Sequence, residues 1–90
     1  FNLSQNAPNP FNMSTMIGYS VEEKGHTTVT VFNCLGQPVK TLVDRDLAPG
    51  VYSMLWNGTD DRGAKVASGM YYYTMSQGSR HAVKRMVLMK

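Results

Sequence analysis

Apolar and polar side chains alternate along most of the chain, and short polar stretches separate the alternating runs. Alternation with a period of two is typical of strands that bury one face. The clearest run is rich in β-branched residues, and its Thr27, Val29 and Val31 share one face. The runs cover residues 17–21, 27–32, 39–43, 52–56, 71–75 and 81–89. No window of a dozen residues has helical periodicity, so the pattern predicts an all-β antiparallel sandwich of six to seven strands.

The stretches between these runs carry the residues that turns require. Gly36 is expected at the tip of a turn over residues 34–38. Residues 44–50 are expected to interrupt the sheet, with Pro49-Gly50 in a type II turn that demands a positive φ at the glycine.

The opening segment, residues 5–12, is uncharged and contains two prolines and one large aromatic side chain. Pro8 and Pro10 cannot donate hydrogen bonds to a sheet, so we expect the segment to run extended along an edge or across an open end of the sandwich. Phe11 would then be the plug that holds the segment against the core.

Three consecutive tyrosines follow Met70. Strand alternation places Tyr71 and Tyr73 on one face and Tyr72 on the other. A pair of core tyrosines is the plain interpretation, and a carbohydrate-stacking platform is the alternative, for which Tyr72 alone is weak.

Length and composition indicate one small globular domain spanning residues 1–90, since 42% of the residues are hydrophobic and 17% are charged. No apolar run approaches the ~18 residues that a transmembrane segment requires. No secretory signal peptide stands at the start of the chain. Because the chain opens directly on a motif, we expect it to be a piece of a longer protein.

The net charge is +3, and four cations without an acid lie between residues 80 and 90. A solvated edge strand explains them, since lysines on an edge oppose aggregation. The alternative is a basic surface for an acidic partner or an anionic glycolipid. Nucleic acid is not an expected partner, because no DNA-binding or RNA-binding signature accompanies these charges.

The sequence offers little for catalysis. His26 and His81 are the only histidines, and no nucleophile motif, phosphate loop or zinc-ligand spacing is present. Cys34 is the single cysteine, and we expect it to be a buried, unreactive thiol. We therefore expect no enzyme activity, no catalytic residue and no cofactor.

The loop over residues 57–63 contains Asn57, Asp60 and Asp61 beside glycines and is the best metal candidate. Such hard oxygen ligands suit calcium. The plainer interpretation is that these side chains cap their own backbone in tight turns, and we therefore assign no metal ligand.

Five segments occur in an order that is similar to a known family. They are LSQNAPNPFNMST at 3–15, LGQPVKTLVD at 35–44, LAPGVYSMLWNGTDDRG at 47–63, VASGMYYYTM at 66–75 and KRMVLMK at 84–90. Together they resemble the C-terminal sorting domain of type IX secretion cargo found in Bacteroidetes. That family in turn resembles the immunoglobulin-like module of the flagellar hook-capping protein. The resemblance covers essentially the whole chain and implies an immunoglobulin-like fold.

The resemblance implies a non-catalytic secretion signal that directs an N-terminal cargo domain of the same chain across the outer membrane. The implied partners are the type IX translocon, a surface peptidase with sortase-like activity, and anionic lipopolysaccharide. The implied location is secreted or cell-surface, reached through the periplasm.

Two recognition surfaces are predicted for this role. One is the opening segment at Asn9, Pro10, Phe11 and Asn12. The other is the last strand, whose exposed edge a partner could extend by strand addition, supplemented by basic side chains. Its contact residues are predicted to be Lys84, Arg85, Val87 and Lys90, with Met86 and Leu88 in the core; alternation leaves the facing around Arg85 open.

Two other functions are compatible with the sequence. The first is an immunoglobulin-like accessory or spacer domain of an extracellular enzyme, binding glycan or calcium. The second is an assembly module of the flagellar-cap type.

Overall fold

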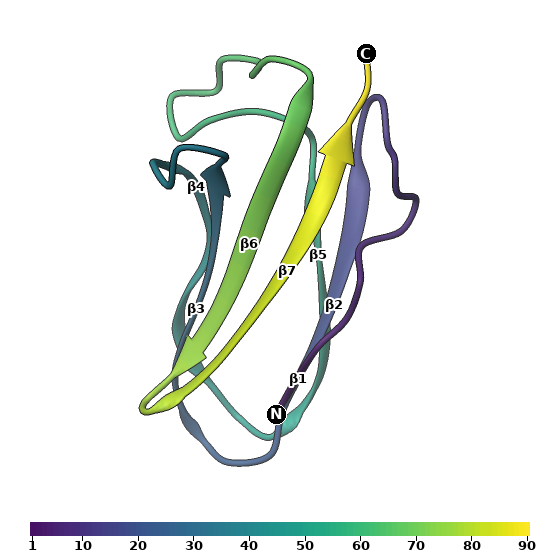
Figure 1. The fold of residues 1–90 in the computed structure, drawn as a ribbon. Helices are drawn as coiled ribbons and strands as arrows, with labels where there is room; N and C mark the ends of the chain where they lie inside the picture. The colour runs from purple at the N-terminus through teal and green to yellow at the C-terminus, as the bar shows by residue number, and fades with distance from the viewer.

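The computed structural model describes residues 1–90 and contains seven strands and no helix. The strands are β1 (Asn2–Leu3), β2 (Thr15–Val21), β3 (Gly25–Asn33), β4 (Pro38–Leu47), β5 (Gly50–Trp56), β6 (Gly69–Gln77) and β7 (Arg80–Leu88). They form two antiparallel sheets, ordered β1-β2-β5 and β4-β3-β6-β7, which lie against each other as two layers (Figure 1). The predicted all-β sandwich is confirmed, with seven strands. No helix is present that could span a bilayer.

The alternation in the sequence separates the core from the outer faces of the sheets. Sixteen buried hydrophobic side chains form one core cluster, and Val29 and Val31 within it are fully buried. Tyr71 and Tyr73 belong to this core, whereas Tyr72 lies on the outer face of its sheet. The prediction of two core tyrosines is therefore confirmed.

Two tyrosines tie the beginnings of strands to the preceding chain. The hydroxyl of Tyr71 donates a hydrogen bond to the carbonyl oxygen of Ala67 at 2.6 Å, and that of Tyr52 donates to Ala48 at 2.5 Å. A tyrosine near the start of a strand that bonds to the backbone a few residues upstream is a feature of immunoglobulin-like sandwiches. Burial raises the pKa of the Tyr71 hydroxyl.

β4 continues to Leu47, so the prediction that residues 44–50 interrupt the sheet is wrong for residues 44–47, and only residues 48–49 lie between β4 and β5. The charged residues in this stretch are exposed on an edge strand, where charge is tolerated and opposes aggregation. Leu42 and Val43 are both buried although they are neighbours, because the register with β3 shifts there. Such a β-bulge inserts one extra residue and changes which face the following side chains occupy.

Of the two glycine turns, one is confirmed and one is not. Gly36 has a φ of 81° at the tip of the β3–β4 turn, as predicted. Gly50 has no positive φ and begins β5 opposite Val21, so Pro49-Gly50 is not a type II turn. Ala48 and Pro49 connect β4 of one sheet to β5 of the other, so the chain does not form a hairpin within one sheet here.

Cys34 is exposed, so the prediction of a buried thiol is wrong. It follows Asn33, whose side-chain oxygen accepts hydrogen bonds from the backbone N–H groups of Leu35 and Gln37, both at 3.0 Å. Residues 34–37 of this capped turn are all exposed, so the side chain of Cys34 does not pack in the core.

Candidate functional site

The opening segment, residues 5–12, crosses the open side of the sandwich from one sheet to the other (Figure 1). Ala7 exchanges two backbone hydrogen bonds with Met16 of β2, at 3.0 and 2.9 Å. Phe11 then forms an isolated parallel bridge to the end of β7. The predicted course along an edge of the sandwich is confirmed, but the segment is not continuously extended, because the chain bends over residues 8–10.

Phe11 anchors this segment in the core. Phe11 is 3% exposed, which confirms the prediction that it holds the segment against the core. The Phe11 N–H donates to the carbonyl oxygen of Val87 at 3.0 Å, and the N–H of Met89 donates to the carbonyl oxygen of Phe11 at 2.8 Å. The ring is therefore closed to a partner as long as the domain stays folded.

A buried polar network fixes the first half of the segment. The backbone N–H of Asn6 donates to the hydroxyl of Tyr73 at 2.8 Å, and its Nδ2 donates to the hydroxyl oxygen of Thr15 at 3.0 Å. The Tyr73 hydroxyl in turn donates to the carbonyl oxygen of Ser4 at 2.7 Å, and burial raises its pKa. No buried side-chain nitrogen or oxygen lacks a partner. Sequence reasoning missed this network, since a polar residue between turn residues looks solvated.

The opening segment also covers the outer edge of β7 over its C-terminal half. The Oδ1 of Asn9 accepts the N–H of Val87 at 3.0 Å, and the Nε2 of Gln5 donates to the carbonyl oxygen of Arg85 at 2.6 Å. With the bonds of Phe11, these contacts use the backbone groups that an added strand would need. The expectation of an open terminal edge is therefore wrong for this half of the strand.

Two of the four cations near the C-terminus are engaged within the domain. The guanidinium of Arg80 lies 3.9 Å from Glu22 and 3.9 Å from Glu23, both in the β2–β3 turn. The ammonium of Lys90 donates to the carbonyl oxygen of Val66. Part of the positive charge at the C-terminus is thus compensated by Glu22 and Glu23, which are distant in sequence but close in the fold.

The remaining predicted residues of β7 divide by face. Met86 and Leu88 are 0% and 1% exposed, which confirms them as core. Lys84 is half-buried on their side of the strand, whereas Arg85 and Val87 lie on the outer face, Arg85 exposed and Val87 half-buried. Arg85 forms no ion pair, since the ion pairs of the domain involve other residues.

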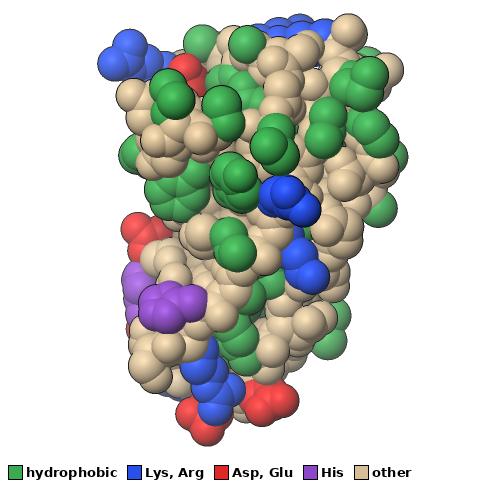
Figure 2. Space-filling view, viewed as in Figure 1, with side chains coloured by type: hydrophobic (Ala, Val, Ile, Leu, Met, Phe, Trp, Pro, Cys, Tyr) green, Lys and Arg blue, Asp and Glu red, His purple; other side chains and the backbone are tan.

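A shallow groove of about 500 Å³ lies where β6, β7 and the opening segment meet. Hydrophobic side chains gather around two basic side chains on this face of the molecule (Figure 2). No acidic residue lines it, and the lining includes Gln5, Asn9, Met70, Tyr72, Val83 and the predicted recognition residues Lys84, Arg85 and Val87. We call this hollow the β6–β7 groove. It unites one part of each predicted recognition surface.

Asn12 and Lys90 lie at a second hollow, of about 430 Å³, which they line together with Met13 and Lys65. Pro10 is exposed. The predicted recognition residues therefore lie in one region of the fold, but they are divided between two hollows. Phe11 is buried and lies in the chain between Asn9 at the first hollow and Asn12 at the second.

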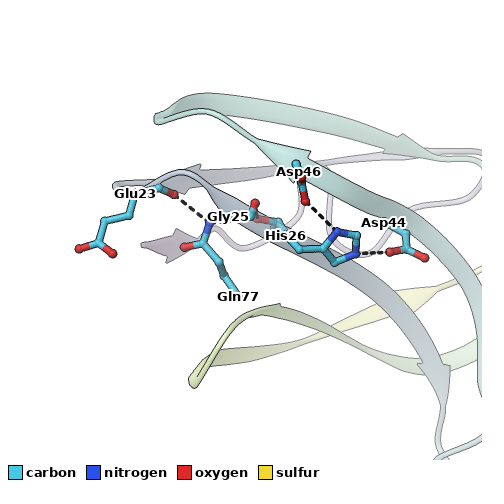
Figure 3. A network of polar contacts seen from close by, with 7 residues as sticks. Glu23, Gly25, His26, Asp44, Asp46 and Gln77 are labelled. Atoms are coloured by element: carbon cyan, nitrogen blue, oxygen red, sulfur yellow. Dashed lines mark hydrogen bonds and ion pairs between the residues drawn. The ribbon is translucent and has the colours of Figure 1, made fainter.

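A second polar cluster lies at the other end of the four-stranded sheet. His26 of β3 lies between two carboxylates of β4, with Nε2 at 2.5 Å from Asp44 and Nδ1 at 3.1 Å from Asp46 (Figure 3). Hydrogen bonds to Asp44 and then to Asp46 raise the pKa of His26. No cluster of three histidine, cysteine or acidic side chains has a metal-binding arrangement, and both nitrogens of this ring are already occupied. Sequence reasoning missed this cluster, because it placed residues 44–46 in a turn and not in a strand next to His26.

The acidic side chains of the loop over residues 57–63 accept hydrogen bonds from backbone N–H groups. The Oδ1 of Asp60 accepts the N–H groups of Arg62 and Ala64 at 2.9 and 3.0 Å. The Oδ1 of Asp61 accepts the N–H of Thr41 at 3.1 Å, which joins the loop to β4. These contacts support the turn interpretation of this loop.

A model of the FlgD Ig-like domain matches residues 12–81. The crystal structure of FlgD from Xanthomonas campestris, described for the hook capping essential for flagellar assembly, matches with a TM-score of 0.66 at 25% sequence identity. The match covers 94% of this chain and 64% of that chain, so the present chain spans slightly less than two thirds of that protein. No curated protein sequence matches. Most of the opening segment and most of β7 lie outside the range of the family model.

Proposed function

The chain belongs to the FlgD Ig-like domain family, and from this premise we propose that it is a non-catalytic recognition module specialised for export. In this proposal it is a folded C-terminal signal that directs an attached cargo protein through the type IX translocon. The cargo then reaches the cell surface or the medium through the periplasm, where a sortase-like peptidase and anionic lipopolysaccharide are further partners. The family alone supports an immunoglobulin-like accessory domain, and the motifs resembling type IX sorting domains support the export role.

The observation that carries the proposal is the pairing of the two ends of the chain. The opening segment forms hydrogen bonds to β7 through Gln5, Asn9 and Phe11, so that residues far apart in sequence form one surface. These two segments are also the parts that lie largely outside the range matched by the FlgD model. A surface assembled in this way exists only in the folded domain, which suits a signal that must report a folded module.

The physical demands of export agree with this arrangement. A translocon that accepts many cargoes needs a signal that is independent of each cargo, and a self-contained sandwich supplies one. Because Phe11 and Asn6 are buried, the segment that would join the cargo is fixed at a defined place on the domain. The recognition surface would then keep the same shape whichever cargo precedes it.

A reporter fusion tests the proposal. The chain is fused to the C-terminus of a fluorescent protein and expressed, with a signal for inner-membrane export, in a host that has the type IX system. We expect the reporter outside the cell with the intact domain and in the periplasm without it. Periplasmic retention of a folded, intact fusion would contradict the export function.

A second function is favoured by the similarity to FlgD over 94% of this chain. A module of the hook-capping type would act by assembly with other subunits and would not be removed from a cargo. Sedimentation of the purified chain distinguishes the two, since the assembly function predicts concentration-dependent oligomers and the export function does not require them.

A further inference from the structure

The register of the four-stranded sheet places three side chains in one row across its outer face. Phe32 of β3 is opposite Tyr72 of β6, and Tyr72 is opposite Arg85 of β7. Both aromatic residues are half-buried on this face, and Arg85 is exposed. Residues directly opposite each other on neighbouring strands are in side-chain contact range. Tyr72 is therefore not an isolated ring but the middle of an aromatic row that ends in a guanidinium.

Apolar side chains border this row on both sides. Met70 is opposite Val87, and Thr74 is opposite Val83. Met70 is 40% exposed and Val83 is 59% exposed, so these walls are open to solvent. Clustered exposed apolar residues next to a hollow are typical of an interaction surface, whereas scattered ones are not.

The charge of the β6–β7 groove has no counterpart within the domain. Arg85 has no acidic partner, and no acidic residue lines the groove. The amide groups of Gln5 and Asn9 are held by the backbone of β7 and form one wall. A free guanidinium between apolar walls is complementary to a carboxylate that is flanked by apolar side chains.

We infer that the β6–β7 groove binds an extended acidic segment of a partner protein. Its carboxylate pairs with Arg85, and an apolar side chain beside it packs against Tyr72 and Val83. A protein segment fits better than an anionic glycolipid, because polyanionic headgroups favour larger clusters of cations, and here only Arg85 and the half-buried Lys84 stand among apolar and amide side chains. That this partner belongs to an export apparatus rests on the proposed function. The inference that the groove binds an acidic segment does not depend on that function.

Synthetic peptides of about eight residues test the groove on the isolated chain. One set alternates aspartate or glutamate with phenylalanine or isoleucine, and a matched set carries lysine at the acidic positions. Backbone amide shifts are followed by NMR during titration. We expect the acidic set to shift the resonances of Met70, Tyr72, Val83 and Arg85 with a dissociation constant on the order of 1 mM or tighter, and the lysine set to leave them unchanged.

Charge reversal supplies the control. Arg85→Glu is expected to raise the dissociation constant of the acidic peptides about tenfold or more. Arg62→Glu makes the same change of charge in an exposed loop and is expected to leave binding unchanged. No shift at the groove with any acidic peptide, or equal losses in both variants, overturns the inference. Vesicles containing lipopolysaccharide form a parallel arm, and binding there through Arg85 without peptide binding overturns it in favour of a glycolipid. Export of the reporter fusion is scored separately, so a failed export function does not decide the peptide result.

Discussion

The ring of Phe11 meets the indole of Trp56 edge-on, with ring centroids 5.6 Å apart and planes inclined by 60°. Trp56 in turn meets Tyr71 edge-on at 5.4 Å and 68°. Edge-to-face pairs at these separations are favourable beyond the area that they bury. The opening segment is thereby joined through one aromatic chain to β5 and β6, which belong to different sheets.

This chain of rings makes Phe11→Ala strongly destabilising. We expect a loss of about 3 kcal/mol in the free energy of unfolding, because truncation of a buried phenylalanine leaves a cavity and here also removes an aromatic pair. Urea denaturation of the purified domain measures it. Asn12→Ala, next in the chain and exposed, is the control and should change stability by less than about 0.5 kcal/mol. A loss that small for Phe11→Ala would show that the ring does not hold the segment.

Tyr73→Phe tests the polar half of the attachment. The hydroxyl of Tyr73 donates to Ser4 and accepts from Asn6, so its removal leaves the buried N–H of Asn6 and the part-buried carbonyl oxygen of Ser4 without this partner. We expect a destabilisation of about 1–3 kcal/mol. Tyr72→Phe on the outer face of the same strand is the matched control, since its hydroxyl makes no hydrogen bond within the domain. Equal effects in the two variants would contradict a structural role for the network.

The sequence was sufficient for much of the fold because burial alternates strictly along most strands. Val29 and Val31 are buried, and Met86 and Leu88 are core, as period two requires. The pattern failed at β4, where a bulge and an exposed charged edge hide the strand. A bulge depends on a partner strand, so the residues of β4 alone could not reveal it.

The candidate site was predicted less completely, since it depends on register. Asn9 and Arg85 were both expected to lie at recognition surfaces, but their meeting at one groove follows from pairing between distant segments. From the sequence, Tyr72 alone is a weak stacking platform, since only the register of the sheet shows that Phe32 and Arg85 lie on either side of it. The burial of Asn6 also escaped prediction, because only the tertiary structure supplies its partners.

Asp60 organises the loop over residues 57–63, and Asp60→Ala should destabilise the domain by about 1–2 kcal/mol. The reason is that its Oδ1 accepts two backbone N–H groups, at 2.9 and 3.0 Å. Asp60→Asn keeps an oxygen acceptor and should retain most of the stability. Thermal unfolding of the three proteins measures the order of stability.

The same measurements separate turn formation from calcium binding. We expect millimolar calcium to leave the melting temperature of the wild-type chain unchanged, because the Asp60 oxygen is used by the backbone. A ligand that binds the folded state alone must raise the midpoint. A calcium-dependent rise that Asp60→Asn abolishes would show that the loop is a cation site after all.

His26 should make stability depend on pH through its two carboxylate neighbours. Asp44 and Asp46 raise its pKa in the folded state above the ordinary value of 6.5, with the hydrogen bond to Asp44 as the largest cause. A histidine whose folded pKa exceeds its unfolded pKa binds protons more tightly when folded. Its stabilisation is therefore fully present below about pH 6.5 and is lost as the pH rises through the folded pKa.

The test is the difference in stability between the wild-type chain and Asp44→Asn, measured by urea denaturation from about pH 5.5 to about pH 9. We expect the wild-type advantage to be largest at the acidic end and to shrink as His26 loses its proton. NMR titration of the ring should show a lower pKa in Asp44→Asn and a smaller decrease in Asp46→Asn, in the order of their contributions. His26→Gln should remove the pH-dependent part of the difference between the aspartate variants and their parent. If the advantage instead grows as the pH rises, the cluster does not act through a protonated histidine, and the close contacts of His26 have another origin.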